Sequence, residues 1–198
     1  MEDELKPIQV AFLDKPNGPD DALLPYKRNE NLVRPWIKPG TKGLEHRIGG
    51  LEKENETGNV SYDPLNHEKM IQLRAAKIEK IADSIPPAKP DSGNEKAKLL
   101  VMGWGSTCGA IKTAVRESLL IGYDVAHVQL KYINPLPKNL GELLKGYDTV
   151  LIPEMNSGQL LQIIRAKYLV PAIGLSKVQG LPFTTTELKA KIADLLKS

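Results

Sequence analysis

Cysteine is almost absent from this sequence, since Cys108 is the only one among 198 residues. A single thiol excludes an internal disulfide framework and any all-cysteine metal or iron–sulfur site within the chain, and it is typical of a reducing compartment. No apolar run approaches the roughly 18 residues that span a bilayer. The acidic start, MEDELKP, lacks the basic and then apolar pattern of a signal peptide. We therefore expect a cytoplasmic protein with no membrane partner.

Charge of one sign is not concentrated anywhere along the chain. Residues 1–97 hold 15 Lys/Arg and 17 Asp/Glu, whereas residues 98–198 hold 12 and 7. The second half is basic, but its cations are scattered singly, whereas a nucleic-acid footprint clusters them. We therefore expect a solvated surface of mixed charge and no nucleic-acid partner.

The first part of the chain has little periodic patterning. Ten of the 15 prolines lie before residue 98, and residues 1–59 sustain neither helical nor strand-like alternation. This pattern predicts an extended arm over residues 1–62 that runs over another surface. Residues 63–97 predict a helix and a proline-bearing linker. Asp63 and Pro64 would begin that helix, and its apolar face would consist of Ile71, Ala75, Ile78, Ala82 and Ile85.

Residues 98–198 alternate regularly between strand-like and helix-like segments. The expected strands cover 98–102, 125–130, 149–152 and 172–175, and the expected helices cover 106–121, 138–145, 157–169 and 185–196. The strands LLVM, TVLI and AIGL are apolar throughout, which is typical of strands covered on both faces. The pattern predicts an α/β domain with a mainly parallel sheet and helices on both faces.

A glycine-rich turn, VMGWGSTCGA, joins the first of these strands to its helix. A dinucleotide-binding turn needs an acidic residue after the second strand, but Asp124 precedes that strand. A tight corner is favoured instead, in which Gly103 and Gly105 permit the turn and Gly109 permits close helix packing. An anion could still bind the free N–H groups at the start of the helix.

Catalytic and metal-binding patterns are missing from the sequence. Cys108 lies on the apolar stripe of its helix, so a buried, unreactive thiol is favoured over a nucleophile. His46, His67 and His127 are too far apart in sequence for a local metal motif, and no serine lies in a G-x-S-x-G elbow. We therefore expect no catalytic residue and no metal site in this chain.

The stretch PEMNSGQLLQIIR joins the third strand to its helix. Glu154 and Asn156 are expected at the carboxyl edge of the sheet, where ligands and partner chains of open α/β sheets gather. Asn156 or Ser157 would cap the helix that begins near Gln159. A simple connection between a strand and a helix explains the stretch about equally well, so both interpretations stay open.

Two blocks of the sequence resemble a known family. The second half of the chain, from GWGSTCGAIKTAV through VLIPEMNSGQLLQIIR, resembles the C-terminal domain of transketolase-type thiamine diphosphate enzymes. RIGGLEKENETGNVSYDPLNHEKMIQLRAAKIEKI, just before that domain, resembles the alpha subunit of 2-oxoacid:ferredoxin oxidoreductases, in particular the 2-oxoglutarate type. The resemblance implies a transketolase C-terminal-like fold. It also implies an enzyme that decarboxylates 2-oxoglutarate on thiamine diphosphate, passes electrons through an iron–sulfur cluster to ferredoxin, and forms succinyl-coenzyme A.

The chain departs from this family in lacking an earlier pyrimidine-binding domain, whose glutamate activates the cofactor. The resemblance therefore implies a C-terminal piece of the alpha subunit that is inactive alone. Thiamine diphosphate, Mg and the iron–sulfur cluster would belong to the complete complex, and this piece would bind none of them. Its partner would be the beta subunit, and it would reach ferredoxin and coenzyme A through the complex.

Two sets of residues are candidates for contacts in such a complex. His46 and Arg47 would lie at a subunit interface, because Gly49 and Gly50 permit a close backbone approach. A wall of the substrate or coenzyme A channel, or an anion site, would be formed by Ser106, Thr107, Asn156, Ser157 and Gln159. Two alternatives stay open, a stand-alone doubly wound module that binds a nucleotide or anion and a purely structural interaction domain.

Overall fold

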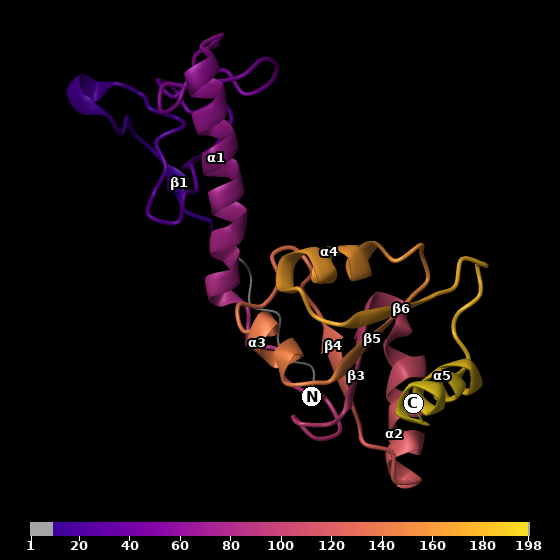
Figure 1. Ribbon diagram of the computed structural model, residues 1–198. Coiled ribbons are helices and arrows are strands. Elements are labelled where there is room, and N and C mark those ends of the chain that lie inside the picture. The colour runs from indigo at the N-terminus through magenta and orange to yellow at the C-terminus, as the bar shows by residue number, and fades with distance from the viewer. Residues whose placement is uncertain (1–9, 198) are drawn as a thin grey trace. The chain divides into compact units, whose positions relative to one another are not determined.

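The computed structural model describes residues 10–197 of the chain, which divides into two compact units between Ile81 and Ala82 (Figure 1). The first unit has one long helix and little other regular structure. The second unit holds a four-stranded sheet with its helices.

The first unit combines short strands, loops and one helix. The strands β1 (Phe12–Leu13) and β2 (Trp36–Ile37) pair in parallel, and a 3₁₀ turn, η1, covers Pro19–Asp21. Helix α1 (Pro64–Lys80) begins as predicted, because Asp63 accepts a hydrogen bond from the Leu65 N–H at 3.0 Å. The 3₁₀ turn η2 (Ile81–Ser84) follows it directly.

The apolar face predicted for α1 is wrong. Ile71 is 48% exposed and Ile78 36% exposed, and Ala75 is exposed too, whereas Met70 is the buried residue of the helix. Ala82 and Ile85 are buried, but they lie beyond the end of the helix, in the second unit. The prediction failed because α1 packs against a polar loop rather than against an apolar layer.

That polar loop is fixed to α1 by hydrogen bonds between side chains and backbone. Asn66, on the helix, accepts from the Asn55 N–H at 2.9 Å and donates to the Lys53 carbonyl at 3.0 Å. Arg28 donates to the Asn55 side chain at 2.9 Å and contacts the Met70 sulfur at 3.6 Å. The unit is therefore organised largely by polar contacts around a small buried centre.

The second unit contains a parallel sheet with the order β4-β3-β5-β6. Its strands are β3 (Leu99–Trp104), β4 (Val125–Leu130), β5 (Thr149–Glu154) and β6 (Ala172–Ser176). Its helices are the 3₁₀ turn η3 (Gly105–Thr107), α2 (Cys108–Leu120), α3 (Leu140–Lys145), α4 (Gln159–Tyr168) and α5 (Thr185–Lys197). In register, Leu99 of β3 lies beside both Val125 of β4 and Thr149 of β5.

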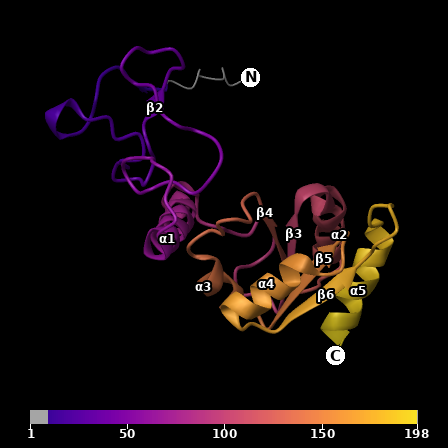
Figure 2. The same ribbon diagram turned by 90° about the horizontal axis from the view of Figure 1, so that it is seen from above.

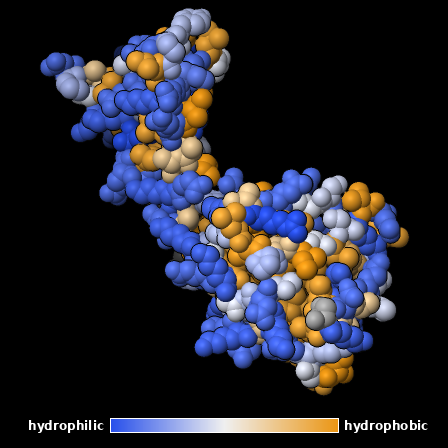
Figure 3. Space-filling view, viewed as in Figure 1, coloured by the Kyte–Doolittle hydropathy of each residue, from blue (hydrophilic) through white to orange (hydrophobic). Residues whose placement is uncertain are grey.

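Helices cover both faces of this sheet (Figures 1 and 2), as the sequence predicted. Helices α2 and α5 enclose one apolar layer, which includes Val101, Leu151 and Ile192. Helices α3 and α4 enclose the other, which includes Leu100 and Ile152. Hydrophobic residues also reach the surface among hydrophilic ones in the view of Figure 3.

The segment expected to be a linker is bound to the second unit. Asn139 accepts from the Ala88 N–H and donates to the Ala88 carbonyl, both at 2.8 Å. The Asp91 N–H donates to the His127 carbonyl at 2.8 Å, and the His127 N–H donates to Ser92 at 2.9 Å. This segment therefore lies along β4, the outer strand of the sheet.

Candidate functional site

The carboxyl ends of β3 and β5 lie side by side at the point where the strand order reverses. The chain runs from β3 outward to β4, then returns to the other side of β3 to form β5 and β6. In open α/β sheets, ligands bind outside the carboxyl ends of the strands at such a point. Two candidate stretches predicted from the sequence, the glycine turn and PEMNSGQ, both start from this edge.

Glu154, the last residue of β5, is the centre of this edge. Its side chain is 1% exposed. One carboxylate oxygen accepts from the Leu160 N–H at 3.0 Å and the other from the Leu161 N–H at 3.0 Å. These N–H groups belong to the first turn of α4, where backbone donors and the helix dipole favour a negative charge. The protein's own carboxylate therefore takes the position at which an external anion would bind α4.

The Glu154 carboxylate also links the two strands of the site. The Trp104 indole N–H, at the end of β3, donates to it at 3.4 Å, and the Asn156 amide donates to it at 3.1 Å. A buried carboxylate with this many donors is held in a fixed position. The arrangement therefore fixes the ends of β3 and β5 relative to α4.

The Asn156 side chain binds the backbone at the start of α4. Its Oδ1 accepts from the Gly158 N–H at 2.7 Å and from the Gln159 N–H at 3.0 Å. Gly158 has φ +88°, in the left-handed region that favours glycine. The N-cap position of α4 is Gly158, so the prediction that Asn156 or Ser157 holds that position is wrong. Ser157 and Gln159 are exposed to solvent.

The corner after β3 places Ser106 beside the β5 loop. Ser106 is exposed and its hydroxyl contacts the Met155 sulfur at 3.9 Å. Thr107 is 6% exposed and donates to the Trp104 carbonyl at 2.8 Å. Thr107 thus stabilises the corner, while Ser106 shares the sheet edge with Asn156, Ser157 and Gln159.

The three glycines of the corner after β3 fulfil only part of the roles predicted for them. Gly105 has φ +57°, a backbone angle that residues with a side chain rarely adopt, so the turn requires glycine there as predicted. A Cβ at Gly103 would lie 2.6 Å from Gln129 Oε1 and 2.7 Å from the Ile111 side chain, so Gly103 is required for close packing. The role predicted for Gly109 is wrong, because a Cβ there would meet no atom within 4 Å.

Gln129 is a residue of this edge that the sequence reasoning missed. It is the second-last residue of β4, beside Gly103 in register, and its amide donates to the Gly105 carbonyl at 3.3 Å. The signal was a lone amide near the end of the apolar run VAHVQL. Gln129 stands near the end of the second strand, where a nucleotide-binding sheet would carry its acidic residue, and this counts against the nucleotide-binding alternative.

His46 and Arg47 belong to the first unit. The His46 ring lies 2.9 Å from the Leu44 carbonyl, and Arg47 is exposed. Both side chains line a hollow of about 450 Å³. A Cβ at Gly49 or Gly50 would meet no described atom within 4 Å, so close packing within the described chain does not require glycine at either position.

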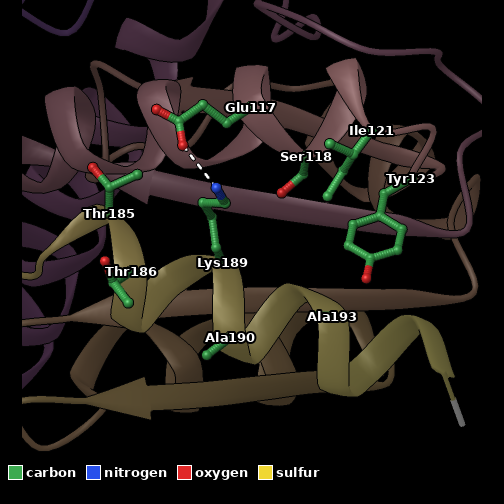
Figure 4. A pocket seen from close by; sticks show the side chains of 9 residues that line it. All are labelled: Glu117, Ser118, Ile121, Tyr123, Thr185, Thr186, Lys189, Ala190 and Ala193. Carbon is green, nitrogen blue, oxygen red and sulfur yellow. Dashed lines mark hydrogen bonds and ion pairs between the residues drawn. The ribbon is translucent and has the colours of Figure 1, made fainter.

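A separate groove of about 480 Å³ lies between α2 and α5 (Figure 4). Glu117 and Lys189 form an ion pair of 2.8 Å across it, and this hydrogen bond lowers the pKa of Glu117. The Ser118 hydroxyl is buried in it without a hydrogen-bond partner. None of the residues predicted as a site from the sequence lines this groove.

Within residues 10–197, no group of three or more His, Cys, Asp or Glu side chains could hold a metal ion. In the same described part of the chain, no helix is long and apolar enough to cross a membrane.

Comparison with known proteins identifies relatives over most of the chain. Residues 97–185 match the family model of the pyruvate:ferredoxin oxidoreductase core domain II. The 2-oxoglutarate oxidoreductase subunit KorA of Mycobacterium tuberculosis is 46% identical to this chain. The aligned region is 93% of this chain and 27% of that protein. The 2-oxoglutarate synthase subunit KorA of Methanocaldococcus jannaschii is 33% identical over 60% of this chain, which covers 31% of it.

A solved structure agrees with these relatives. The 2-oxoglutarate:ferredoxin oxidoreductase from Magnetococcus marinus, with 2-oxoglutarate, coenzyme A and succinyl-CoA bound, matches 92% of this chain with a TM-score of 0.81 and 27% identity. The match covers 32% of that chain, so the present chain spans between about a quarter and a third of the proteins it resembles. The chain is therefore homologous to part of the alpha subunit of the 2-oxoacid:ferredoxin oxidoreductases, as its sequence predicted.

Proposed function

We propose that this chain serves as a non-catalytic part of the alpha subunit of a thiamine-diphosphate-dependent 2-oxoacid:ferredoxin oxidoreductase, with 2-oxoglutarate as the oxoacid. The observation that carries the proposal is the 46% identity to a 2-oxoglutarate oxidoreductase subunit over 93% of the chain. The whole enzyme would decarboxylate the oxoacid oxidatively, form an acyl-coenzyme A and reduce ferredoxin. This chain would contribute to subunit assembly and to one wall of the substrate or coenzyme A channel.

The geometry of the sheet edge supports the channel-wall role. Glu154 and Asn156 hold the start of α4 rigidly, and Ser106, Ser157 and Gln159 stand exposed beside them. Neutral hydroxyl and amide groups orient a polar ligand through hydrogen bonds, and a serine hydroxyl is only a weak nucleophile unless a base activates it. The edge is therefore suited to positioning a ligand, and the chemistry would take place elsewhere in the complex.

The residues of this chain do not fit the cofactors that the family implies. An iron–sulfur cluster needs several thiolates, and Cys108 is the only cysteine. The N-terminus of α4, where a diphosphate would find backbone donors, already holds the Glu154 carboxylate. We therefore propose that thiamine diphosphate, Mg and the cluster are bound by other parts of the enzyme, in a cytoplasmic complex that includes a beta subunit.

The channel-wall role can be tested in the complete enzyme with the double variant Ser157→Ala/Gln159→Ala, which replaces two exposed side chains of the edge. We expect the complex to assemble normally and the KM for 2-oxoglutarate or coenzyme A to rise, because the variant removes polar contacts at the wall. Gln162→Ala, on the exposed surface of the same helix, is the matched control and should leave both values unchanged. If the double variant had the same KM values as the wild-type enzyme, this edge would not be part of the channel wall.

The interface role of His46 and Arg47 needs a separate test. Replacing both with alanine should weaken association with the beta subunit, because these side chains line one hollow of the first unit. Association as strong as that of the wild-type chain, measured by size-exclusion chromatography, would count against this role.

A further inference from the structure

The groove between α2 and α5 contains a buried hydroxyl that lacks a hydrogen-bond partner. Ser118 of α2 is 1% exposed, and no group among the described residues pairs with its Oγ. Figure 4 shows this hydroxyl pointing from α2 into the space toward α5. A buried polar group without a partner is costly, and native proteins satisfy nearly all of them. The hydroxyl therefore indicates that a polar group enters the groove.

A charge of each sign faces the same groove. The Lys189 ammonium of α5 and the Glu117 carboxylate of α2 lie 2.8 Å apart across it, and their side chains are 37% and 40% exposed. An ammonium has three donors and a carboxylate about four acceptor positions, so one bond between them leaves most of this capacity free. Both groups can therefore contact a ligand without giving up their ion pair.

The groove also has apolar walls and the size of a small-molecule site. Ile121 and Tyr123 line it on the α2 side, and Ala190 and Ala193 line it on the α5 side. Its volume of about 480 Å³ lies within the roughly 300–1,000 Å³ of ligand pockets and far exceeds the roughly 30 Å³ that one water occupies. The small alanine side chains leave this space open beside the two charges.

Charge balance distinguishes between the small molecules that could bind there. Glu117 and Lys189 are the charged residues of the lining, and together they are neutral. An anion would add a net negative charge beside Glu117, and a cation would add a net positive charge beside Lys189, which is unfavourable where water is partly excluded. A zwitterion adds no net charge and offers an opposite charge to each side chain.

We propose that this groove binds a small zwitterion, an α-amino acid with an apolar side chain. Its carboxylate binds the Lys189 ammonium and accepts from the Ser118 hydroxyl, while its ammonium donates to Glu117. Its side chain packs against Ile121 and Ala193. The groove shares no residue with the sheet edge proposed as a channel wall, so this inference goes beyond the proposed function and does not depend on it.

Isothermal titration calorimetry of the full chain tests the proposal, with L-leucine and L-phenylalanine as the probes. We expect saturable binding of one molecule per chain. Two analogues of leucine separate its charged groups, because 4-methylpentanoate lacks the ammonium and 3-methylbutylamine lacks the carboxylate. Each should bind about tenfold more weakly than L-leucine or worse, since each loses a charge-assisted contact. This series uses the wild-type chain, so it does not depend on the folding of any variant.

Three variants locate the bound molecule. Lys189→Met keeps the apolar stem and removes the cation, and Glu117→Gln removes the anion at nearly the same shape. Each should weaken leucine binding by about tenfold or more. Lys191→Met is the matched control, because Lys191 lies on the same helix, pairs with Asp194 at 3.0 Å and does not line the groove. It should bind within about twofold of wild type, and circular dichroism should show that all three stay folded.

The outcomes decide for or against the site. No saturable binding of either amino acid to the folded wild-type chain would overturn the inference, as would binding that Lys189→Met and Glu117→Gln leave unchanged. Equal or tighter binding of 4-methylpentanoate, or of inorganic phosphate, would show an anion site and overturn the zwitterion. None of these results bears on the proposed function, which is tested by assembly and by the kinetics of the complete enzyme.

Discussion

The two units of this chain are stabilised in different ways. The second unit buries a hydrophobic layer on each face of its sheet, whereas Leu44 and Met70 are the buried hydrophobic residues among those described in the first. The first unit even buries Lys53, whose ammonium group donates to the Gly49 carbonyl at 2.9 Å and to the Leu51 carbonyl. The second unit therefore has an apolar core of its own, whereas the described part of the first is held mainly by polar contacts.

The largest effect is expected in the core of the second unit, at Ile164→Ala. Ile164 is fully buried under the sheet, and removing a buried isoleucine side chain costs about 2–5 kcal/mol of unfolding free energy. Ile163→Ala, at its neighbour on α4 that is 50% exposed, should cost about 1 kcal/mol or less. Urea unfolding measures both, and equal losses would contradict the apolar-core account.

A smaller loss is expected at the sheet edge, from Glu154→Gln. The amide keeps the shape of the side chain but places an N–H₂ group against helix donors, which should cost about 1–3 kcal/mol. The Trp104 environment should change as well, because its indole N–H donates to this carboxylate. Urea unfolding followed by tryptophan emission measures both effects in one experiment. Wild-type stability together with unchanged emission would show that Glu154 does not organise this edge.

The second unit should also lose stability at mildly acidic pH because of His127. Burial in β4 lowers the pKa of His127 below the usual histidine value of 6.5, although the nearby Asp91 carboxylate opposes this shift. The folded state therefore favours the neutral ring. The stability that this provides is present above pH 6.5 and falls as the pH drops through the lowered pKa. The variant His127→Gln should lack this fall in stability with decreasing pH. Urea unfolding midpoints of both proteins between pH 7.5 and 5 test this.

The smallest effect is expected in the first unit, at Glu52. Hydrogen bonds from His67, at 2.7 Å, and then from Arg74 lower the pKa of Glu52 to about 2. The stabilisation is therefore present above the unfolded pKa of 4.5 and is lost as the pH falls toward 2. It should stay below about 1 kcal/mol, because both partners are exposed.

Hydrogen exchange of the loop over residues 45–60 measures this local effect. Glu52→Gln should speed exchange at pH 6 and remove its acid dependence below pH 4.5. Glu68→Gln is the control, since the Glu68 carboxylate accepts from Gln72, one turn along the same helix, at 3.2 Å. If the two variants behaved alike, the ion pair would have no part in holding the loop.

Sequence periodicity was informative where burial is periodic. Every strand and helix of the second unit was predicted within a few residues, because apolar runs and stripes there reflect two covered faces of a sheet. The buried face of α1 could not be predicted in the same way. Met70 is buried by Arg28 and a polar loop, and contacts of this kind leave no apolar period in the sequence.

The candidate site was predicted in position but not in detail. The spacing after β5 correctly placed Glu154 and Asn156 at the carboxyl edge of the sheet, because a parallel strand order fixes that edge. The carboxylate of Glu154 as the cap of α4, and the contact of Gln129 with the glycine corner, depend on the register between strands. That register arises only on folding. The roles of Ser106, Thr107, Asn156, Ser157 and Gln159 in ligand binding stay a prediction.

The most direct test of the account is whether this chain forms a complex with the proposed beta subunit. Size-exclusion chromatography with multi-angle light scattering gives the mass of the mixture. We predict co-elution at the combined mass of the two chains, which would place the role of this piece at a subunit interface. Separate elution of two well-folded proteins would contradict that account.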